Sequence, residues 1–566
     1  MAGLYGIYSP KQFIPKGNYG RMFGKGSAIV TSENTFKNFT YGRKVLDKLL
    51  EDRVLYELDD IIIGYEGINF DAKENARYLY EEYKNKGISF VDDIDGRFSG
   101  FIYDKISGKL HVFTDHLSTK SVYYYFSKAH KIFIFSSELK LISNLLRELK
   151  IPISYDHDGI ACLLSIGYML DDLTLISEVK KLTQGNILTF DPGVWNLKTR
   201  QFFSHKIHPQ KMNLKDAINR IDEAMTAAVL KEWEKDRQYN FQHLAFLSGG
   251  LDSRVNVLIA NQLGYRSDLV HTFAQSNSGD HIIAREIADH YNFKQIFHPL
   301  DSGSYLAGNI YEYVEANDGL TVYNGAAHMY WALSKLDLQP YGLAHTGHIG
   351  GGVFGVQTKK TADMAGMIRK QSYVKDQHIL NRISIIDEVA SRYQELGYEM
   401  FAYEQRRPNA MLNGDRMISH MIDLASPFFD KTLLNLFKTI PVEYKSDQRI
   451  YFKWFNEKHP YISKFRYDSS GIKPKNAVTT KYARKLRAAY KKLRGSDKNN
   501  MNPFEKWYSE NPAIPAKLES TYRQYLESVR DKDIKALIQY TYNLDGVQPK
   551  ISAVTALVAL HLHFEK

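Results

Sequence analysis

A glycine-rich turn carries the most explicit chemistry in this sequence. It reads Leu247-Ser248-Gly249-Gly250-Leu251-Asp252-Ser253, between the apolar run 244–247 and the apolar segment 255–260. Neighbouring glycines let backbone N–H groups point inward, the serines add hydroxyl donors, and a helix N-terminus adds partial positive charge, so the turn suits a phosphate or pyrophosphate. Asp252 has the charge to bind the Mg²⁺ that accompanies such groups. No lysine follows the glycines, which argues against the phosphate loop of kinases and GTPases; a plain strand-to-helix turn is the alternative.

Composition indicates a globular protein with more than one domain. The 566 residues are 44% hydrophobic and 13% aromatic, enough for sizeable cores. The single cysteine, Cys162, excludes a disulfide framework and a cysteine-rich metal site, so we expect a reducing compartment, the cytoplasm. We see no leader in residues 1–10 and expect no membrane partner, because the longest apolar run, 553–564, contains two histidines and predicts a buried helix.

Positive charge is concentrated in one segment. Residues 473–498 hold ten basic side chains and one acid, so they carry +9 of the net charge of +10. Such a segment can bind nucleic acid, a membrane surface or an anionic substrate, or it can be a solvated helix face. Aromatic residues within it are only Tyr482 and Tyr490, which disfavours single-stranded nucleic acid as the partner.

Strand and helix patterns divide the chain into two domains. Residues 1–205 alternate short strand-like runs with turns, which predicts an α+β layered domain rich in antiparallel sheet. From Asn213 a helical pattern leads into the glycine-rich turn and strand–helix alternation follows, which predicts an α/β domain over 213–566. After Leu412 the pattern is mainly helical. The link at 204–213, which contains Pro209, is the expected boundary.

Further motifs follow a fixed order around the turn. Before it come Asp95–Asp104 (D-G-R-F-S-G-F-I-Y-D), Asp115-His116-Leu117 and Ser136–Lys140 (S-S-E-L-K); after it come Asp415-Arg416-Met417 and Ser426–Asp430 (S-P-F-F-D). Together with S-G-G-x-D-S, these segments resemble the asparagine synthetase family, which includes β-lactam synthetase and lasso-peptide cyclase members. The resemblance implies an N-terminal nucleophile-type αββα sandwich, glutaminase-like, joined to an adenine-nucleotide α-hydrolase-like domain with a helical C-terminal part.

The resemblance also implies a reaction and a set of residues. A carboxylate attacks the α-phosphorus of ATP to give an acyl-adenylate and pyrophosphate, and an amine or ammonia then attacks the acyl carbon. The residues expected to hold pyrophosphate are Ser248, Gly249, Gly250 and Ser253, with Asp252 on Mg²⁺; those expected to line the adenosine site are Leu247, Gln275, Thr346 and Gly347.

Two further residues are catalytic candidates beside Asp252. Lys475 matches the family's late lysine, which would neutralise the transition state, although a surface lysine in a basic loop is equally consistent. Asp423 keeps a carboxylate in the segment before S-P-F-F-D. In β-lactam synthetase-like members a tyrosine and a glutamate together act as the general base toward the amine, and Asp423 could take the glutamate's role if a tyrosine lies near it.

The chain departs from the family pattern at three places. Ala2 stands where the family has its nucleophilic cysteine, and Tyr65-Glu66-Gly67 replaces an N-G-E motif, so we expect no glutamine hydrolysis. Gly351 and Gly352 stand in the loop Thr346–Gly355 where an aspartate and a glutamate belong, so we expect weakened metal affinity. In the same loop His345 and His348 form an H-x-x-H, which can bind a metal but is more often incidental.

The resulting prediction is an ATP-dependent amide-forming ligase that uses ATP and Mg²⁺, acts on a small-molecule or peptide carboxylate, and takes ammonia or a substrate amine instead of glutamine. The alternative is a catalytically impaired homologue that serves as a nucleotide-binding or partner-binding scaffold. A tRNA-modifying enzyme ranks last, because it leaves the glutaminase-like half unexplained, so we do not expect nucleic acid. The sequence is compatible with a homodimer but does not determine the oligomeric state.

Overall fold

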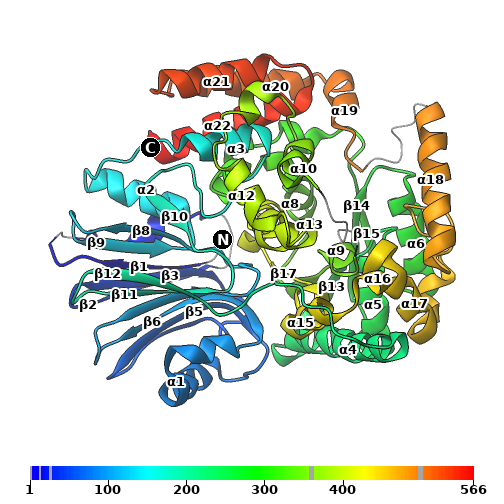
Figure 1. Ribbon diagram of the computed structural model, residues 1–566, viewed down its shortest axis with the longest axis horizontal. Coiled ribbons are helices and arrows are strands. Elements are labelled where there is room, and N and C mark those ends of the chain that lie inside the picture. The colour runs from blue at the N-terminus through cyan, green and yellow to red at the C-terminus, as the bar shows by residue number, and fades with distance from the viewer. Residues whose placement is uncertain (1–2, 12–13, 25–28, 356–361, 495–500, 566) are drawn as a thin grey trace.

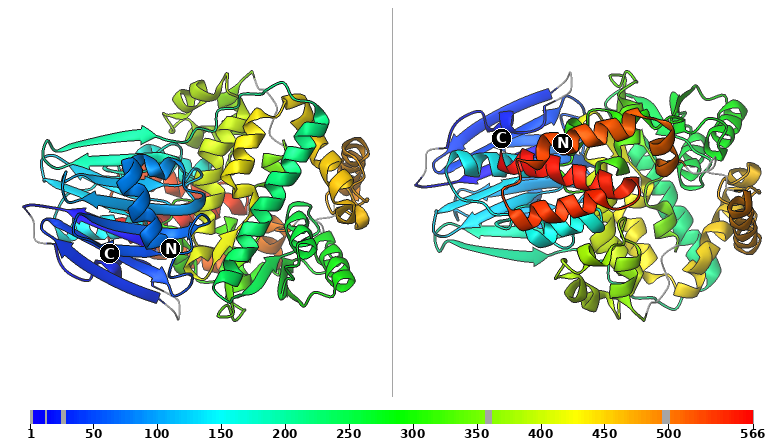
Figure 2. Two further views of the ribbon diagram at one scale, coloured as in Figure 1. Left: turned by 90° about the horizontal axis from the view of Figure 1, so that it is seen from below. Right: turned by 90° about the horizontal axis from the view of Figure 1, so that it is seen from above.

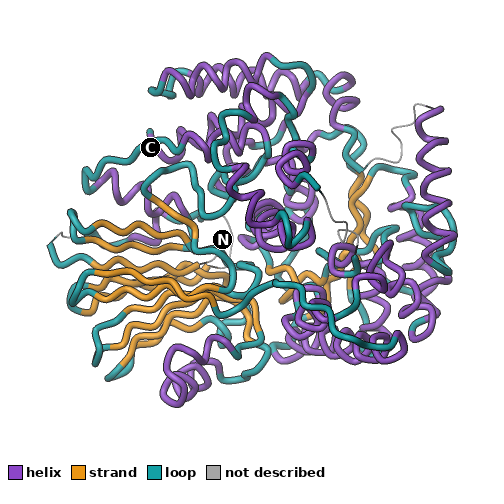
Figure 3. Tube along the Cα trace, in the orientation of Figure 1, coloured by secondary structure: helices purple, strands orange, loops and turns teal. Residues whose placement is uncertain are grey.

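The computed structural model describes residues 3–11, 14–24, 29–355, 362–494 and 501–565. Three sheets organise them (Figures 1 and 3): two antiparallel sheets face each other in the N-terminal part, and a parallel sheet lies in the second part, surrounded by helices. The predicted α+β sandwich followed by an α/β domain with a helical C-terminal part is confirmed.

The antiparallel sheets contain six strands each. The first has the order β10-β8-β9-β1-β3-β2 and the second β12-β11-β7-β6-β5-β4. Their bounds are β1 Gly3–Tyr8, β2 Ile29–Phe36, β3 Phe39–Leu46, β4 Val54–Glu57, β5 Ile61–Asn69, β6 Gly96–Asp104, β7 Leu110–Thr114, β8 Tyr123–Ser127, β9 Ile132–Ser136, β10 Val179–Lys181, β11 Asn186–Asp191 and β12 Asn196–Gln201.

Apolar faces of the two sheets meet in an aromatic core. Phe39, Phe101, Phe133, Phe135 and Phe190 are all buried in it. Helix α1 (Asn75–Lys86) covers the outer face of the second sheet and α2 (Leu139–Glu148) that of the first, whereas α3 (His157–Ser165) packs beside α22 (Val547–Phe564) (Figure 1). The arrangement is therefore an αββα sandwich.

The parallel sheet has the order β15-β14-β13-β16-β17, with bounds β13 Gln242–Phe246, β14 Leu269–Ala274, β15 Gln295–Pro299, β16 Tyr341–His345 and β17 Asp423–Ala425. The strand order reverses at β13, and ligands of open parallel sheets bind outside the carboxyl ends of the strands at such a point. The glycine-rich turn follows β13 directly, so the fold brings it to that edge.

Helices fill most of the remainder. Their bounds are α4 Leu214–Gln238, α5 Asp252–Gln262, α6 Gly279–Tyr291, α7 Ile310–Ala316, α8 Ala327–Leu333, α9 Gly350–Val353, α10 Met364–Lys370, α11 Gln377–Leu380, α12 Ile386–Tyr393, α13 Tyr398–Phe401, α14 Leu412–Asp415, α15 Lys431–Thr439, α16 Val442–Lys445, α17 Arg449–Lys458, α18 Ala477–Arg494, α19 Phe504–Glu510, α20 Ala513–Leu526, α21 Lys532–Asn543 and α22 Val547–Phe564. A π-helix spans Ala402–Met411. The predicted domain bounds stay predictions, although α4 begins with Asn213 as its N-cap.

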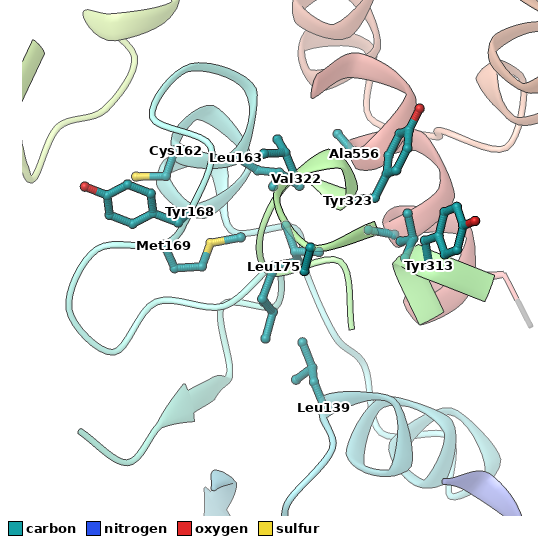
Figure 4. Close-up of a cluster of buried hydrophobic side chains, with 14 of the residues drawn as sticks. Leu139, Cys162, Leu163, Tyr168, Met169, Leu175, Tyr313, Val322, Tyr323 and Ala556 are labelled. Atoms are coloured by element: carbon teal, nitrogen blue, oxygen red, sulfur yellow. The ribbon is translucent and has the colours of Figure 1, made fainter. Parts of the chain in front are cut away.

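Helix α22 is the buried helix that the apolar run predicts. Most of its side chains are buried, and it packs with α2 and α3 of the sandwich as well as α7, α20 and α21. At its end His563 bonds Ser143 Oγ and the main-chain oxygen of Asp318. Figure 4 shows part of this core, where Cys162 lies beside Tyr168 and Ala556 beside Tyr323. In the described part of the chain, no helix is long and apolar enough to cross a membrane.

Buried ion pairs join the sandwich to the parallel-sheet domain. Arg53, in the loop before β4, pairs with Glu66 of β5 and, at 2.6 Å, with Asp423 at the start of β17. Lys120 pairs with the other Asp423 oxygen at 2.5 Å. Arg97 of β6 pairs with Glu232 of α4 and donates to the main-chain oxygen of Leu424. The two domains therefore meet through charges that are withdrawn from water.

Candidate functional site

The glycine-rich turn connects β13 to the N-terminus of α5. Gly250 N–H donates to Ser248 Oγ at 3.1 Å, and Gly249 N–H donates to Asp280 Oδ1 at 2.9 Å. Neither glycine has a positive φ. Close neighbours leave no room for a side chain at Gly249, because an added Cβ would lie 2.9 Å from the Gly279 oxygen and 2.9 Å from Asp468 Cβ. The turn is thus held against the start of α6 and the 467–468 segment.

A pocket of about 720 Å³ opens at this edge of the sheet. A volume of that size is typical of sites for small molecules and cofactors. Its walls come from the turn, the loop after β16, α8 and the π-helix. Of the predicted residues, it is lined by Leu247, Ser248, Gly250, Asp252, Ser253, Thr346 and Gly347.

The other predicted residues lie elsewhere. Gly249 belongs to the turn but is not part of the pocket wall, and Gln275 is buried outside it. Lys475 is exposed in the loop before α18 and does not line the pocket. Ala2 lies outside the described residues.

Asp252 is the acidic group at the head of α5. Tyr451 Oη donates to its Oδ1 at 2.9 Å, and Gly351 N–H donates to its Oδ2 at 2.7 Å. Burial against the pocket wall raises the pKa of Asp252 to about 6, although both hydrogen bonds act to lower it. Among the residues that the structure describes, no lysine or arginine forms an ion pair with this carboxylate. A partly buried anion without a basic partner fits a metal ion.

The loop Gly350–Gly352 meets Asp252 through its backbone. An added Cβ on Gly350 would lie 2.6 Å from Asp252 Cγ, so only glycine allows this contact. On Gly352 it would lie 2.2 Å from Nη2 of Arg407, whose side chain lines the pocket and stacks on Tyr403. The loop therefore supplies an N–H donor and a neighbouring guanidinium, and Asp252 is the carboxylate that it contacts in the described part of the chain. This set fits Mg²⁺ bound through Asp252 and the ligand's phosphates.

His348 and Asp415 form a hydrogen-bonded pair in the same pocket. His348 Nδ1 lies 3.0 Å from Asp415 Oδ2, and both side chains line the pocket wall. Burial would lower the pKa of His348, but the charge and hydrogen bond of Asp415 outweigh burial and raise it. A histidine oriented by a carboxylate at one ring nitrogen presents the other to a substrate, which is the arrangement of a general base. Sequence reasoning missed the pair; the available signal was that His348 directly follows Thr346 and Gly347, two residues expected at the adenosine site.

His345 does not join His348. It is fully buried, and its Nε2 lies 2.8 Å from Asp236 Oδ2, which His243 also contacts at 3.2 Å. The H-x-x-H pattern therefore brings no pair of ligands to the pocket, because the two histidines turn to different carboxylates.

Asp423 lies in the domain interface and outside the pocket. Burial would raise its pKa, but Lys120 and Arg53 hold it well below its usual range. Both oxygens are engaged by these cations, and its side-chain hydrogen bonds in the described residues go to them and not to a tyrosine. The condition for a base role is not met, so we no longer propose Asp423 as catalytic.

Comparisons with known proteins agree with this arrangement. Residues 55–203 match the model of a glutamine amidotransferase domain and residues 220–458 that of asparagine synthase. A putative glutamine-hydrolysing asparagine synthetase 2 of Methanocaldococcus jannaschii is 26% identical over 242 residues, which are 40% of this chain and 45% of that protein. Asparagine synthetase 2 of Bacillus subtilis is 26% identical over 244 residues, 39% of this chain and 29% of that protein. The chain thus spans less than half the length of these relatives.

Among solved structures, glutamine phosphoribosylpyrophosphate amidotransferase of B. subtilis is 10% identical. The match covers 47% of this chain and 65% of that one, with a TM-score of 0.21.

The pKa of Asp252 predicts a stability effect that depends on pH. The pKa of Asp252 is about 6 in the folded protein and near 3.8 in the unfolded chain. The protonated carboxyl therefore adds to the free energy of unfolding; this stabilisation is fully present below about pH 3.8 and is lost as pH rises through about 6. Asp252→Asn should therefore stabilise the ligand-free protein by on the order of 1–2 kcal/mol at about pH 7.5, with a much smaller gain at about pH 4.5. Urea unfolding at both pH values measures this; an equal gain at the two would contradict it.

Asp423 should contribute to the free energy of unfolding and not to catalysis. Asp423→Ala leaves Arg53 and Lys120 buried without their shared partner, so we expect unfolding in urea to become easier by about 3–5 kcal/mol. Asp60→Ala, which removes an ion pair with the half-exposed Lys84, is the matched control and should cost under about 1 kcal/mol. A stable Asp423→Ala protein that binds ATP but has lost turnover would return Asp423 to the catalytic residues.

Proposed function

Because this chain belongs to the asparagine synthase family, we propose that it is an ATP-dependent ligase that activates a carboxylate as an acyl-adenylate and joins it to an amine. The observation that carries the proposal is that one pocket holds both the glycine-rich turn with Asp252 and the His348–Asp415 pair. The first group suits pyrophosphate and the second suits an attacking amine. A single cavity can thus serve both half-reactions.

The turn and the start of α5 would bind ATP phosphates in the first half-reaction. A substrate carboxylate oxygen attacks the α-phosphorus, the bond to the β-phosphate oxygen breaks, and pyrophosphate leaves. The side chains of Ser248 and Ser253 and the N-terminus of α5 face the pocket where this charge develops. Mg²⁺ held by Asp252 would neutralise part of the pyrophosphate charge.

The His348–Asp415 pair would act in the second half-reaction. The amine nitrogen attacks the acyl carbon, the bond to the AMP oxygen breaks, and Nε2 of His348 takes the proton that the nitrogen loses. Asp415 holds Nδ1 at 3.0 Å, which fixes the ring and stabilises the imidazolium that forms. We propose this pair as the base in place of Asp423.

We further propose that the amine does not come from glutamine. The single cysteine of the sequence, Cys162, is buried in α3, and burial raises the pKa of its thiol well above the usual value, so it is unsuited to nucleophilic attack. Figure 4 shows it among apolar side chains of the core. Glu66, which stands in the altered glutamine motif, is buried and paired with Arg53. Both observations support ammonia or an amine of the substrate as the nucleophile.

Other side chains that line the pocket indicate the kind of acid it would take. Val322, Ala326, Met329 and Met411 are apolar, and Arg406 and Arg407 add two cations. These side chains suit a carboxylic acid with an apolar portion, either a small molecule or a peptide end.

The competing proposal is a nucleotide-binding scaffold. It rests on Gly351 and Gly352, which stand where the family has an aspartate and a glutamate.

Isotope exchange between ATP and pyrophosphate tests the ligase proposal. With Mg²⁺ and a panel of amino, sugar and peptide acids, we expect exchange with some acid, because adenylation is reversible before the amine binds. Asp252→Ala should abolish it, whereas Asp387→Ala, which changes an exposed carboxylate, should leave it intact. If ATP binds and no acid supports exchange, the scaffold is the better description.

The pH dependence of amide formation tests the base. His348 must be neutral to accept a proton, so the rate should rise with pH through a pKa above the usual value for histidine. His348→Gln should slow amide formation by about 10²–10⁴ while ATP–pyrophosphate exchange persists. Asp415→Asn should shift the rise to lower pH, because it removes the charge that raises the pKa. An unchanged pH profile in both variants would exclude this pair as the base.

A further inference from the structure

The outward face of α18 (Ala477–Arg494) carries an exposed apolar stripe. Helix α18 lies at the edge of the molecule, away from the sandwich (Figures 1 and 2). Val478, Tyr482 and Leu486 follow one another at four-residue spacing, so they share one face of the helix. They are 59%, 63% and 73% exposed, respectively. Single exposed apolar residues are ordinary, but an aligned set on one helix face marks a contact surface.

The opposite face attaches the helix to the protein. Arg484 donates to Tyr467 Oη at 2.9 Å, and Arg487 donates to Asp468 Oδ1 at 3.2 Å. Thr480 on the same side is fully buried. The folded protein therefore sets the direction in which the stripe points, and it points to solvent.

Exposed basic side chains lie on the helix and in the loop before it. Lys485 lies on the helix beside Tyr482 and Leu486, and Lys473 lies in the loop that leads into the helix; both are exposed. These belong to the segment 473–498, whose excess of basic residues is +9. An apolar stripe with lysines beside it is the pattern of a helix that lies in the plane of a membrane surface, with apolar side chains inserted and lysine stems reaching the headgroups.

We infer that α18 docks this protein on an anionic lipid surface. The positive charge complements acidic headgroups, and it would repel the same face of a second copy of the chain. Nucleic acid would match the charge but leaves the apolar stripe without a role. The inference differs from the expectation of no membrane partner, because that expectation rested on the lack of a spanning segment, which a surface helix does not need. It is independent of the proposed function.

Docking through α18 would bring the membrane surface close to the glycine-rich turn. Arg487 holds Asp468, whose N–H donates to the main-chain oxygen of Gly249 at 3.1 Å, and Tyr467 lines the pocket. The segment that anchors α18 is thus the segment that packs on the turn. A membrane-bound protein would keep its pocket near the lipid surface.

Vesicle flotation with the full chain tests the inference. We expect flotation with phosphatidylcholine vesicles that contain phosphatidylglycerol, and not with phosphatidylcholine alone, and weaker binding in high salt. The triple variant Val478→Ser/Tyr482→Ser/Leu486→Ser should lose binding, since it removes the inserted side chains. Lys473→Gln and Lys485→Gln should each weaken binding about fivefold. All five side chains are exposed, so circular dichroism should be unchanged.

Ile106→Ser and Val194→Ser are matched controls, because these side chains are 81% and 72% exposed but lie in the sandwich domain. They should bind vesicles like the unaltered protein. Equal binding to neutral and anionic vesicles, or a triple variant that still floats, would overturn the inference. No flotation with either vesicle would also overturn it, and retention on immobilised polyglutamate would then assign the face to an acidic protein.

Discussion

The structure depends on a set of charges buried between its two domains. Arg53 lies between Glu66 of the sandwich and Asp423 of the parallel sheet, and Lys120 completes the pairing of Asp423. In a medium of low polarity each charge is tolerated only with its partner, so the domains cannot separate without a large desolvation cost. Asp423 begins β17, which pairs with β16, the strand that leads into Thr346 and Gly347. The interface therefore also positions one wall of the pocket.

Two aspartates differ in whether a cation neutralises their negative charge. Asp423 is neutralised by two cations of the sandwich, which keeps it ionised and removes it from chemistry. Among the described residues Asp252 accepts hydrogen bonds from Tyr451 and Gly351 and has no ion-pair partner, so burial raises its pKa to about 6. The compensated carboxylate holds the fold together, and the uncompensated one faces the pocket.

Local signals in the sequence were sufficient for much of the architecture. The apolar run followed by S-G-G-x-D-S predicted a strand, turn and helix, and the structure has them as β13, the turn and α5. Long-range partners were beyond reach: the cations of Asp423 come from residues 53 and 120, and the partner of His348 lies 67 residues away. In the sequence, Gly351 and Gly352 indicated only the loss of two acidic residues, because the close packing of Gly350 on Asp252 and of Gly352 on Arg407 is visible only in three dimensions.

Helix α22 has a consequence for how the chain folds. It lies at the end of the printed sequence, yet it fills the space between α2 and α3 of the sandwich and α7 of the second domain. The apolar faces of α2 and α3 must wait for more than 380 residues of synthesis, and that of α7 for more than 230, before α22 covers them. Contacts of such sequence separation form slowly and leave apolar surface exposed meanwhile. Completion of both domains is therefore a late and shared step of folding, and protection by chaperones would matter most before it.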